Sequence, residues 1–170
     1  MGTEPKAAEC CLIDKKFVAA VFERQKKRGD APNRLGRSYC HAMEYQYWDL
    51  LAWFGIDVSC DRQRWPYVMI ATAVSSSQFR RSGSLSLGRS IALCYKNGRD
   101  CRAARKRLRQ LTESNDLSEI GHHLRLLFSF IDKKVSQPLD FAKILSQLKS
   151  ISHGERHIAR AQWTQEFYGN

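Results

Sequence analysis

The chain has 170 residues, with 28 Lys or Arg against 17 Asp or Glu, which gives a formal net charge of +11. A hydrophobic content of 43% and an aromatic content of 11% allow a packed core and exclude a disordered basic tail. No apolar run reaches the ~20 residues of a membrane helix, and the N-terminus lacks the layout of a secretory signal. We therefore expect a soluble cytoplasmic protein, without membrane contact, that has a polyanionic partner.

Hydrophobic residues recur at helical spacing along almost the whole chain. The first predicted helix covers residues 10–28 and ends before a Gly-Asp-Ala-Pro cluster, because proline cannot continue a helix. A second helix is predicted over residues 42–54, and a third begins at Asp61 as its cap. The residues expected on the buried faces of the first two helices include Ile13, Phe17, Val21, Tyr45, Trp48, Leu51 and Ala52. Residues 75–83 are predicted to form a mobile surface loop.

Five helices are predicted beyond this loop, at residues 84–96, 99–111, 116–131, 138–151 and 154–167. Ser84 and Asp116 are candidate N-caps, and Pro138 is expected in a first helical turn, where proline is tolerated. No segment alternates as a strand would. The sequence therefore predicts an all-α fold of two small helical bundles packed together with no significant β-sheet, an N-terminal bundle at 1–80 and a C-terminal bundle at 81–170.

The six cysteines form neither a CxxC pair nor a zinc-knuckle spacing; they are Cys10, Cys11, Cys40, Cys60, Cys94 and Cys101. An even number of cysteines is weak evidence for disulfides in a chain of this size. We expect reduced thiols in the core, because a buried cysteine packs as a small hydrophobe.

Positive charge is concentrated in one part of the chain. The segment 80–109 contains ten cations and a single acid, Asp100. The cations are Arg80, Arg81, Arg89, Lys96, Arg99, Arg102, Arg105, Lys106, Arg107 and Arg109. At ~100° per residue, four of them share one arc of their helix: Arg102, Arg105, Lys106 and Arg109. The apolar residues Cys101, Ala104, Leu108 and Leu111 occupy a separate arc. One face is therefore expected to pack and the other to offer cations to solvent.

Clustered like charge destabilises a fold by self-repulsion, and a phosphate backbone relieves that repulsion. Arginine, which binds phosphate in a bidentate manner, predominates in the cluster. The sequence has no RNP aromatics, GXXG clamp or zinc-finger spacing, so it shows no apparatus for reading bases. These features predict contact with the sugar–phosphate backbone.

Catalytic patterns are weak in this sequence. Residues 83–90 fit a Walker A pattern with Arg in place of Lys. A P-loop follows a buried strand, whereas polar residues precede this segment. The better interpretation is a helix N-terminus that favours an anion, with Arg89 beside it. His153 and His157 have the spacing of a helical metal pair without a third ligand, and they also extend a basic stripe with Arg156 and Arg160. Carboxylates are scattered. We expect no catalytic residues, no metal and no cofactor.

Several segments resemble the small subunit of the type I-E CRISPR effector complex Cascade, the CasB family. The resemblance rests on SLSLGRSIAL followed by a basic helix, on Leu-Arg-Leu-Leu at 124–127, and on ARAQWTQEFYG near the end. It continues upstream through the aromatic helix at residues 47–55. Order and spacing together carry the resemblance over nearly the whole chain.

This resemblance implies a non-catalytic, all-helical subunit that packs with a second copy of itself along the crRNA-bearing backbone and large subunits. Its basic faces would hold the displaced non-target DNA strand and the region of the guide–target duplex, which keeps the R-loop open. The residues that match basic positions of the family are Arg34, Arg37, Arg89, Lys106, Arg107, Arg125 and Arg160. The sequence departs from the family at His157 and Ile158, where Arg156 can supply a charge.

The sequence leaves two other functions open. One is a helical scaffold whose basic face docks onto an acidic protein surface. The other is a metal-dependent nuclease that uses His153 and His157. A steep dependence of DNA affinity on salt distinguishes strand contact from protein docking.

Overall fold

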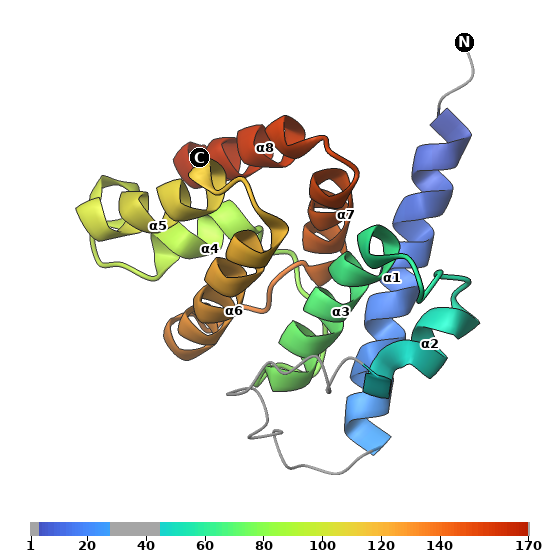
Figure 1. Ribbon diagram of the computed structural model, residues 1–170. Coiled ribbons are helices and arrows are strands. Elements are labelled where there is room, and N and C mark those ends of the chain that lie inside the picture. Colours follow the sequence, from blue (N-terminus) through green and yellow to red (C-terminus); the bar gives the residue numbers. More distant parts are fainter. Residues whose placement is uncertain (1–3, 28–44, 170) are drawn as a thin grey trace.

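The computed structural model describes residues 4–27 and 45–169, with side chains from residue 11 onward. Within these ranges the chain forms helices joined by short connections (Figure 1): α1 (Glu4–Lys27), α2 (Trp48–Trp53), α3 (Asp61–Ser76), α4 (Leu87–Leu93), α5 (Arg102–Glu113), α6 (Leu117–Lys134), α7 (Phe141–Ser152) and α8 (Arg156–Tyr168). Residues 45–47 form a 3-10 turn before α2, and a further 3-10 turn, η3 (Gly98–Asp100), precedes α5. The only β pairing in the described ranges is an isolated bridge between Leu85 and Leu139. The predicted all-α fold is confirmed.

The helices form two neighbouring groups. α1, α3 and α7 pack against one another, whereas α4 packs mainly on α8, with α5 and α6 beside them (Figure 1). α7 contacts both α3 and α8 and therefore connects the groups. One hydrophobic cluster runs through both of them, from Phe17 of α1 to Phe167 of α8. The domain boundary at residue 80 stays a prediction. α7 belongs to the predicted C-terminal bundle, yet it packs on α1 and α3 of the predicted N-terminal bundle.

α1 is amphipathic, but its buried face differs from the predicted one at its N-terminal end. Phe17 and Val21 are buried as expected, whereas Ile13 is exposed and the neighbouring Asp14 is only 1% exposed. The Asp14 carboxylate accepts hydrogen bonds from Lys149 Nζ on α7 at 2.9 Å and from the Tyr67 hydroxyl on α3 at 3.4 Å. Burial raises the pKa of Asp14, although the bonds from Lys149 and Tyr67 act in the opposite direction.

α3 contacts both α1 and α7, and half of its residues are buried. Pro66 stands inside this helix and has no backbone N–H, so the carbonyl of Arg62 lacks the bond that it would accept within the helix. The hydroxyl of Ser152, at the end of α7, donates to that carbonyl at 2.7 Å. A tertiary hydrogen bond thus replaces the one that proline removes, which fits α3 closely against α7.

α4 and α8 meet backbone to backbone. A Cβ atom at Gly88 of α4 would overlap the carbonyl oxygen of Trp163 and the backbone nitrogen of Phe167. The absence of a side chain at Gly88 therefore permits this approach. Trp163 is fully buried at the contact, and its indole N–H donates to Gln147 Oε1 of α7 at 2.8 Å.

Several local predictions need correction. Tyr45, which precedes α2, is 62% exposed, and Ala52 is also exposed. Leu51 is fully buried, and Trp48 and Leu50 are partly buried against the core. α4 begins at Leu87 rather than at Ser84, and α7 begins at Phe141 with Asp140 as its cap. Pro138 and Ser84 lie outside these helices because their segments join in the Leu85–Leu139 bridge. Asp116 is confirmed as an N-cap, accepting from the backbone N–H groups of Ser118 and Glu119 at 3.1 and 3.3 Å.

Residues 77–83 form a loop, but the loop is attached to the rest of the fold. Ser77 is buried, and its hydroxyl donates to Asp132 on α6 at 2.9 Å. The backbone N–H of Gly83 donates to the Leu139 carbonyl at 2.8 Å. The prediction of a mobile surface loop missed these contacts because their partners lie more than 50 residues away in the sequence.

The described cysteines Cys11, Cys60, Cys94 and Cys101 are free thiols. Cys11 is exposed, contrary to the expectation of a core position, and burial raises the pKa of Cys94 to about 11. Cys10 and Cys40 have no described side chains. No helix in the described part of the chain is long and apolar enough to cross a bilayer.

Candidate nucleic-acid interface

α5 separates its cations from its packed face as the sequence predicts. The four cations on one arc are all exposed, and we call them the α5 basic face: Arg102, Arg105, Lys106 and Arg109. On the opposite arc Ala104, Leu108 and Leu111 are buried against the neighbouring helices α4, α6 and α8. The same leucines that fix the helix on the core therefore hold the four cations outward on a rigid support.

The contacts of the α5 basic face leave it cationic. Arg109 forms an ion pair with Glu113 at 3.1 Å, with both side chains about 70% exposed. Arg105 donates to the backbone carbonyl of Asp100 at 3.1 Å, which neutralises no charge. Exposed ion pairs of this kind contribute at most about 1 kcal/mol, so Arg109 can exchange its partner for a phosphate. The face presents four positive charges with one acidic side chain paired at its edge.

The cations that precede α5 extend toward the end of α8. Lys96 is exposed on the connection between α4 and η3. Arg89 donates to the Gly169 carbonyl at 3.1 Å, and Arg99 donates to the Tyr168 carbonyl at 2.7 Å. Cations are favoured at a helix C-terminus, where carbonyls lack intrahelical partners. Arg89 and Arg99 therefore bind the last turn of α8 while their side chains remain at the surface.

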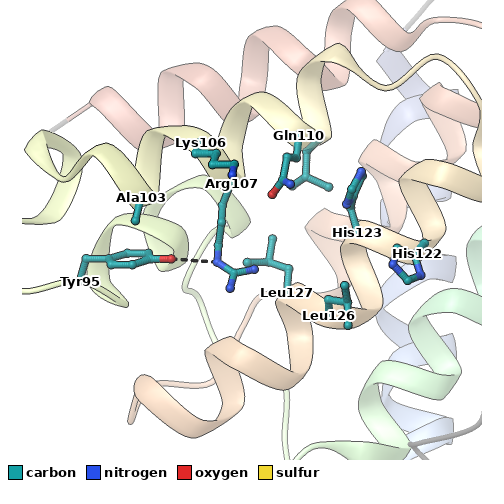
Figure 2. A pocket seen from close by; sticks show the side chains of 10 residues that line it. Tyr95, Ala103, Lys106, Arg107, Gln110, His122, His123, Leu126 and Leu127 are labelled. Atoms are coloured by element: carbon teal, nitrogen blue, oxygen red, sulfur yellow. Dashed lines mark hydrogen bonds between the residues drawn. The ribbon is translucent and has the colours of Figure 1, made fainter.

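Arg107 faces a different direction from its neighbours on α5. It is half-buried, its Nε donates to the Tyr95 hydroxyl at 2.8 Å, and its guanidinium lies 4.4 Å from the ring centre of Phe130. Figure 2 shows this guanidinium pointing into the space between α5 and α6. Arg107 belongs to the wall of a pocket of about 440 Å³, which we call the α5–α6 pocket.

The α5–α6 pocket joins residues that the sequence did not connect. Its lining consists of Tyr95, Ala103, Lys106, Arg107, Gln110, Leu111, His122, His123, Leu126 and Leu127. Lys106 belongs both to this lining and to the α5 basic face. The sequence analysis assigned no role to His122 and His123. The signal that could have found them is their spacing, because they stand one turn before Leu126 and Leu127 and therefore lie on the same side of α6.

Arg156 and Arg160 serve mainly to attach α8. Arg160 donates to the Ser114 carbonyl at 2.7 Å and to Asn115 Oδ1 at 3.1 Å, and Arg156 donates to the Asn115 carbonyl. Both side chains are half-buried against the connection between α5 and α6. Their donors thus satisfy the backbone after the end of α5, and a phosphate would compete with those bonds.

The predicted stripe that joined Arg156 and Arg160 to His153 and His157 is wrong. α7 ends at Ser152, and Gly154 turns the chain with φ of 93° before α8 begins. His153 is the C-cap of α7, and its Nδ1 lies 2.7 Å from the Lys149 carbonyl. The spacing of His153 and His157 is therefore not that of two residues on one helix. In the part of the chain that the structure describes, no three potential metal ligands gather in one place.

Among the described residues, the other predicted cations lie on elements other than α5. Arg80 and Arg81 are exposed and line a second pocket of about 420 Å³ beside Lys15 and Lys26 of α1. Arg125 is half-buried on α6. The predicted residues Arg34 and Arg37 lie outside the described residues.

The N-terminus of α4 binds an anion from the protein itself. The Glu166 carboxylate of α8 accepts from the Gly88 backbone N–H at 3.1 Å and from Gln147 Nε2 at 2.9 Å. Lys143 pairs with the same carboxylate at 2.8 Å. The sequence correctly indicated that this helix N-terminus binds an anion. The anion is the Glu166 carboxylate. The close contact between Gly88 and α8 leaves no room for a nucleotide. The Walker-like pattern is thus a packing motif.

Comparison with known proteins agrees with this geometry. Residues 27–168 match the family of the CRISPR-associated protein Cse2. The crystal structure of M. ruber CasB is similar in fold, with a TM-score of 0.62 and 18% identity, over 89% of this chain and 92% of that one. No curated protein sequence matches the chain.

The fold is therefore that of an all-helical CRISPR-associated protein. Because the family match covers most of its length, the chain belongs to the Cse2 family, the CasB-type small subunits of Cascade. The resemblance seen in the sequence is confirmed.

Proposed function

We propose that this chain, as a Cascade small subunit, binds nucleic-acid backbone without catalysis and thereby stabilises the R-loop in antiviral defence. Its ligands are the displaced non-target DNA strand and the guide–target region. Its protein partners are the crRNA-bearing backbone, the large subunit and a second copy of itself. Membership of the Cse2 family supports a place in Cascade.

The α5 basic face is the observation that carries the proposal. Four exposed cations stand on one side of a helix whose other side is buried in the core. Cations gathered on one exposed face can neutralise phosphates of a strand, and each phosphate neutralised releases condensed counterions. Lys96 is exposed on the connection that precedes η3 and α5, and it can add a further positive charge. Arg89 and Arg99 can contribute charge from the surface, although each also binds the end of α8.

Such backbone contacts suit an R-loop. The guide–target duplex is about as stable as the DNA duplex that it replaces, so modest contacts with the strands shift the balance. Sequence is read by base pairing with the guide, so a subunit that holds the strands needs cations and no base-reading apparatus. The absence of recognisable base-reading motifs in the sequence is consistent with this division of roles.

The decisive experiment reverses the charge of the α5 basic face by Arg102→Glu, Arg105→Glu, Lys106→Glu and Arg109→Glu in the assembled effector complex. Circular dichroism should show unchanged helix content, since all four side chains are exposed. Target-DNA affinity should fall. The slope of log affinity against log salt should become shallower by about 3, because each phosphate that is no longer bound removes ~0.7–0.9 from that slope.

The matched control reverses four exposed cations on α1, α3 and α6: Lys16, Lys27, Arg62 and Lys133. The control has the same net charge as the test variant but retains the α5 basic face, so its salt slope should stay close to that of the parent. If the α5 variant assembles and opens target DNA as well as the control does, the proposal is wrong. Failure of the variant to enter the complex, with DNA contact preserved in isolation, would instead favour docking onto an acidic protein surface.

A further inference from the structure

The α5–α6 pocket is large enough for a nucleotide and opens beside the α5 basic face. Its volume of about 440 Å³ lies within the range of small-molecule sites. Figure 2 shows Arg107, Gln110 and His123 directed toward the space between the helices, with Leu127 on its floor. Lys106 lies on both the pocket rim and the basic face. A strand that follows the basic face therefore passes the entrance of the pocket.

The lining has the charge and hydrogen-bond donors that suit an anion. It contains Lys106, Arg107, Gln110 and two histidines, and none of these lining residues carries a carboxylate. The Glu119 carboxylate of α6, outside the lining, lies 3.8 Å from His123 Nε2. Tyr95 and Phe130 hold the Arg107 side chain by a hydrogen bond at 2.8 Å and a cation–π contact at 4.4 Å. Because Arg107 is held in place before any ligand arrives, less conformational entropy is lost on binding.

The α6 side of the pocket offers flat and apolar surface. The rings of His122 and His123 lie 5.8 Å apart at 63° to each other, and His122 is exposed. Leu126 follows one turn later and is 54% exposed, which leaves a large apolar side chain at the pocket edge. An imidazole face and an aliphatic side chain are suitable stacking surfaces for a nucleobase.

We propose that the α5–α6 pocket binds one unstacked base of a single nucleic-acid strand, with the adjoining phosphate at Lys106, an inference that rests on the proposed function. The base lies against His122 and Leu126, while Gln110 and Arg107 face its edge. Every base has a flat face, so this contact is tolerant of sequence. The pocket makes the subunit favour single strands, whose bases are free to turn outward, over duplex DNA.

The test compares two fluorescent single strands with the same number of phosphates, one oligothymidylate and one abasic, in binding to the full chain at low salt. The parent protein should bind oligothymidylate about tenfold more tightly than the abasic strand, as expected for stacking of one base. The double variant His122→Ala/Leu126→Ala should reduce this ratio to about one and leave abasic binding unchanged, since it retains every cation.

The matched control is His157→Ala/Ile158→Ala, which removes an exposed imidazole and an exposed aliphatic side chain from α8, outside the pocket. It should keep the tenfold ratio. A ratio near one in the parent protein, or a ratio that the pocket variant does not lower, overturns the inference while leaving backbone binding in place. If neither strand binds, the inference fails together with the proposed function.

An oligoglutamate peptide provides the remaining arm of the test. Competition by this peptide should be weak and equal for the parent protein and the pocket variant. If the peptide instead competes strongly, and the pocket variant abolishes that competition without changing the base-dependent ratio, the pocket binds an acidic protein segment and the inference is overturned.

Discussion

α5 and α8 both carry arginines at helical spacing, yet the two helices use them differently. The cations of the α5 basic face are exposed, with the helix anchored by leucines on its other side. On α8, Arg156 and Arg160 are half-buried and donate to the backbone at the end of α5. The difference lies in what faces each arginine. Unpaired backbone carbonyls beside a helix end recruit guanidinium groups as structural donors, whereas an open face leaves them for a ligand.

The largest expected effect concerns the packed side of α8. Trp163→Ala should lower the free energy of unfolding by about 3–5 kcal/mol, because it empties a fully buried site and leaves Gln147 Oε1 without its indole donor. Urea denaturation followed by circular dichroism measures this decrease. Trp53→Ala removes the same side chain from a position that is 77% exposed, and it should cost less than about 1 kcal/mol. Similar decreases for the two variants would contradict the assigned burial.

The next effect tests the comparison of the arginines directly. Arg160→Ala should lower the free energy of unfolding by about 2 kcal/mol, because the Ser114 carbonyl loses a charged donor. Arg102→Ala on the α5 basic face should change it by no more than about 0.5 kcal/mol. The same denaturation measurement serves both variants. Equal stabilities would mean that the arginines of α8 are as free as those of α5.

A buried ion pair extends the comparison to the pH dependence of stability. Burial raises the pKa of Asp14 above its ordinary value of 3.8, so the folded protein holds this proton more tightly than the unfolded chain. The resulting stabilisation is present below that ordinary value and is lost as the pH rises through the raised pKa. The free energy of unfolding of the parent protein, measured relative to Asp14→Asn, should therefore fall as the pH rises across this window.

Asp57 is the control for the sign of this effect. Hydrogen bonds from Ser59 lower the pKa of the exposed Asp57 carboxyl. Its stabilisation is therefore present above the ordinary pKa and is lost as the pH falls through the lowered one. The stability of the parent protein relative to Asp57→Asn should rise with pH over the acidic range. Slopes of the same sign for Asp14 and Asp57 would contradict the different environments of the two carboxylates.

The smallest effect concerns a single cation of the α5 basic face. Arg102→Gln should weaken binding to a single strand modestly and make the slope of log affinity against log salt shallower by about 0.7, the value for one phosphate contact. Arg62→Gln on α3 removes another exposed arginine and should leave the slope unchanged. A salt titration by fluorescence anisotropy measures both. An unchanged slope for Arg102→Gln places that arginine off the path of the strand.

Prediction from sequence succeeded where the relevant interactions are local. The separation of cations from leucines on α5 and the Asp116 cap of α6 depend on residues within a few positions of each other. Prediction failed for the histidine stripe, because the turn at Gly154 interrupts the helical spacing. It also failed for Ile13, since the burial of Asp14 depends on Lys149, which lies 135 residues away. The assignment of the α5 basic face to nucleic acid stays a prediction.

The sequence by itself determined that this protein is helical, that it is basic, and that the cations of α5 stand opposite its apolar residues. Helical period and charge are properties of neighbouring residues and need no knowledge of the fold. Only the tertiary structure decided which cations are available to a ligand. It placed Glu166 at the start of α4, Arg160 on the Ser114 carbonyl and Arg107 in the α5–α6 pocket. Those roles depend on which distant polar group lies within hydrogen-bonding distance, and packing alone sets that.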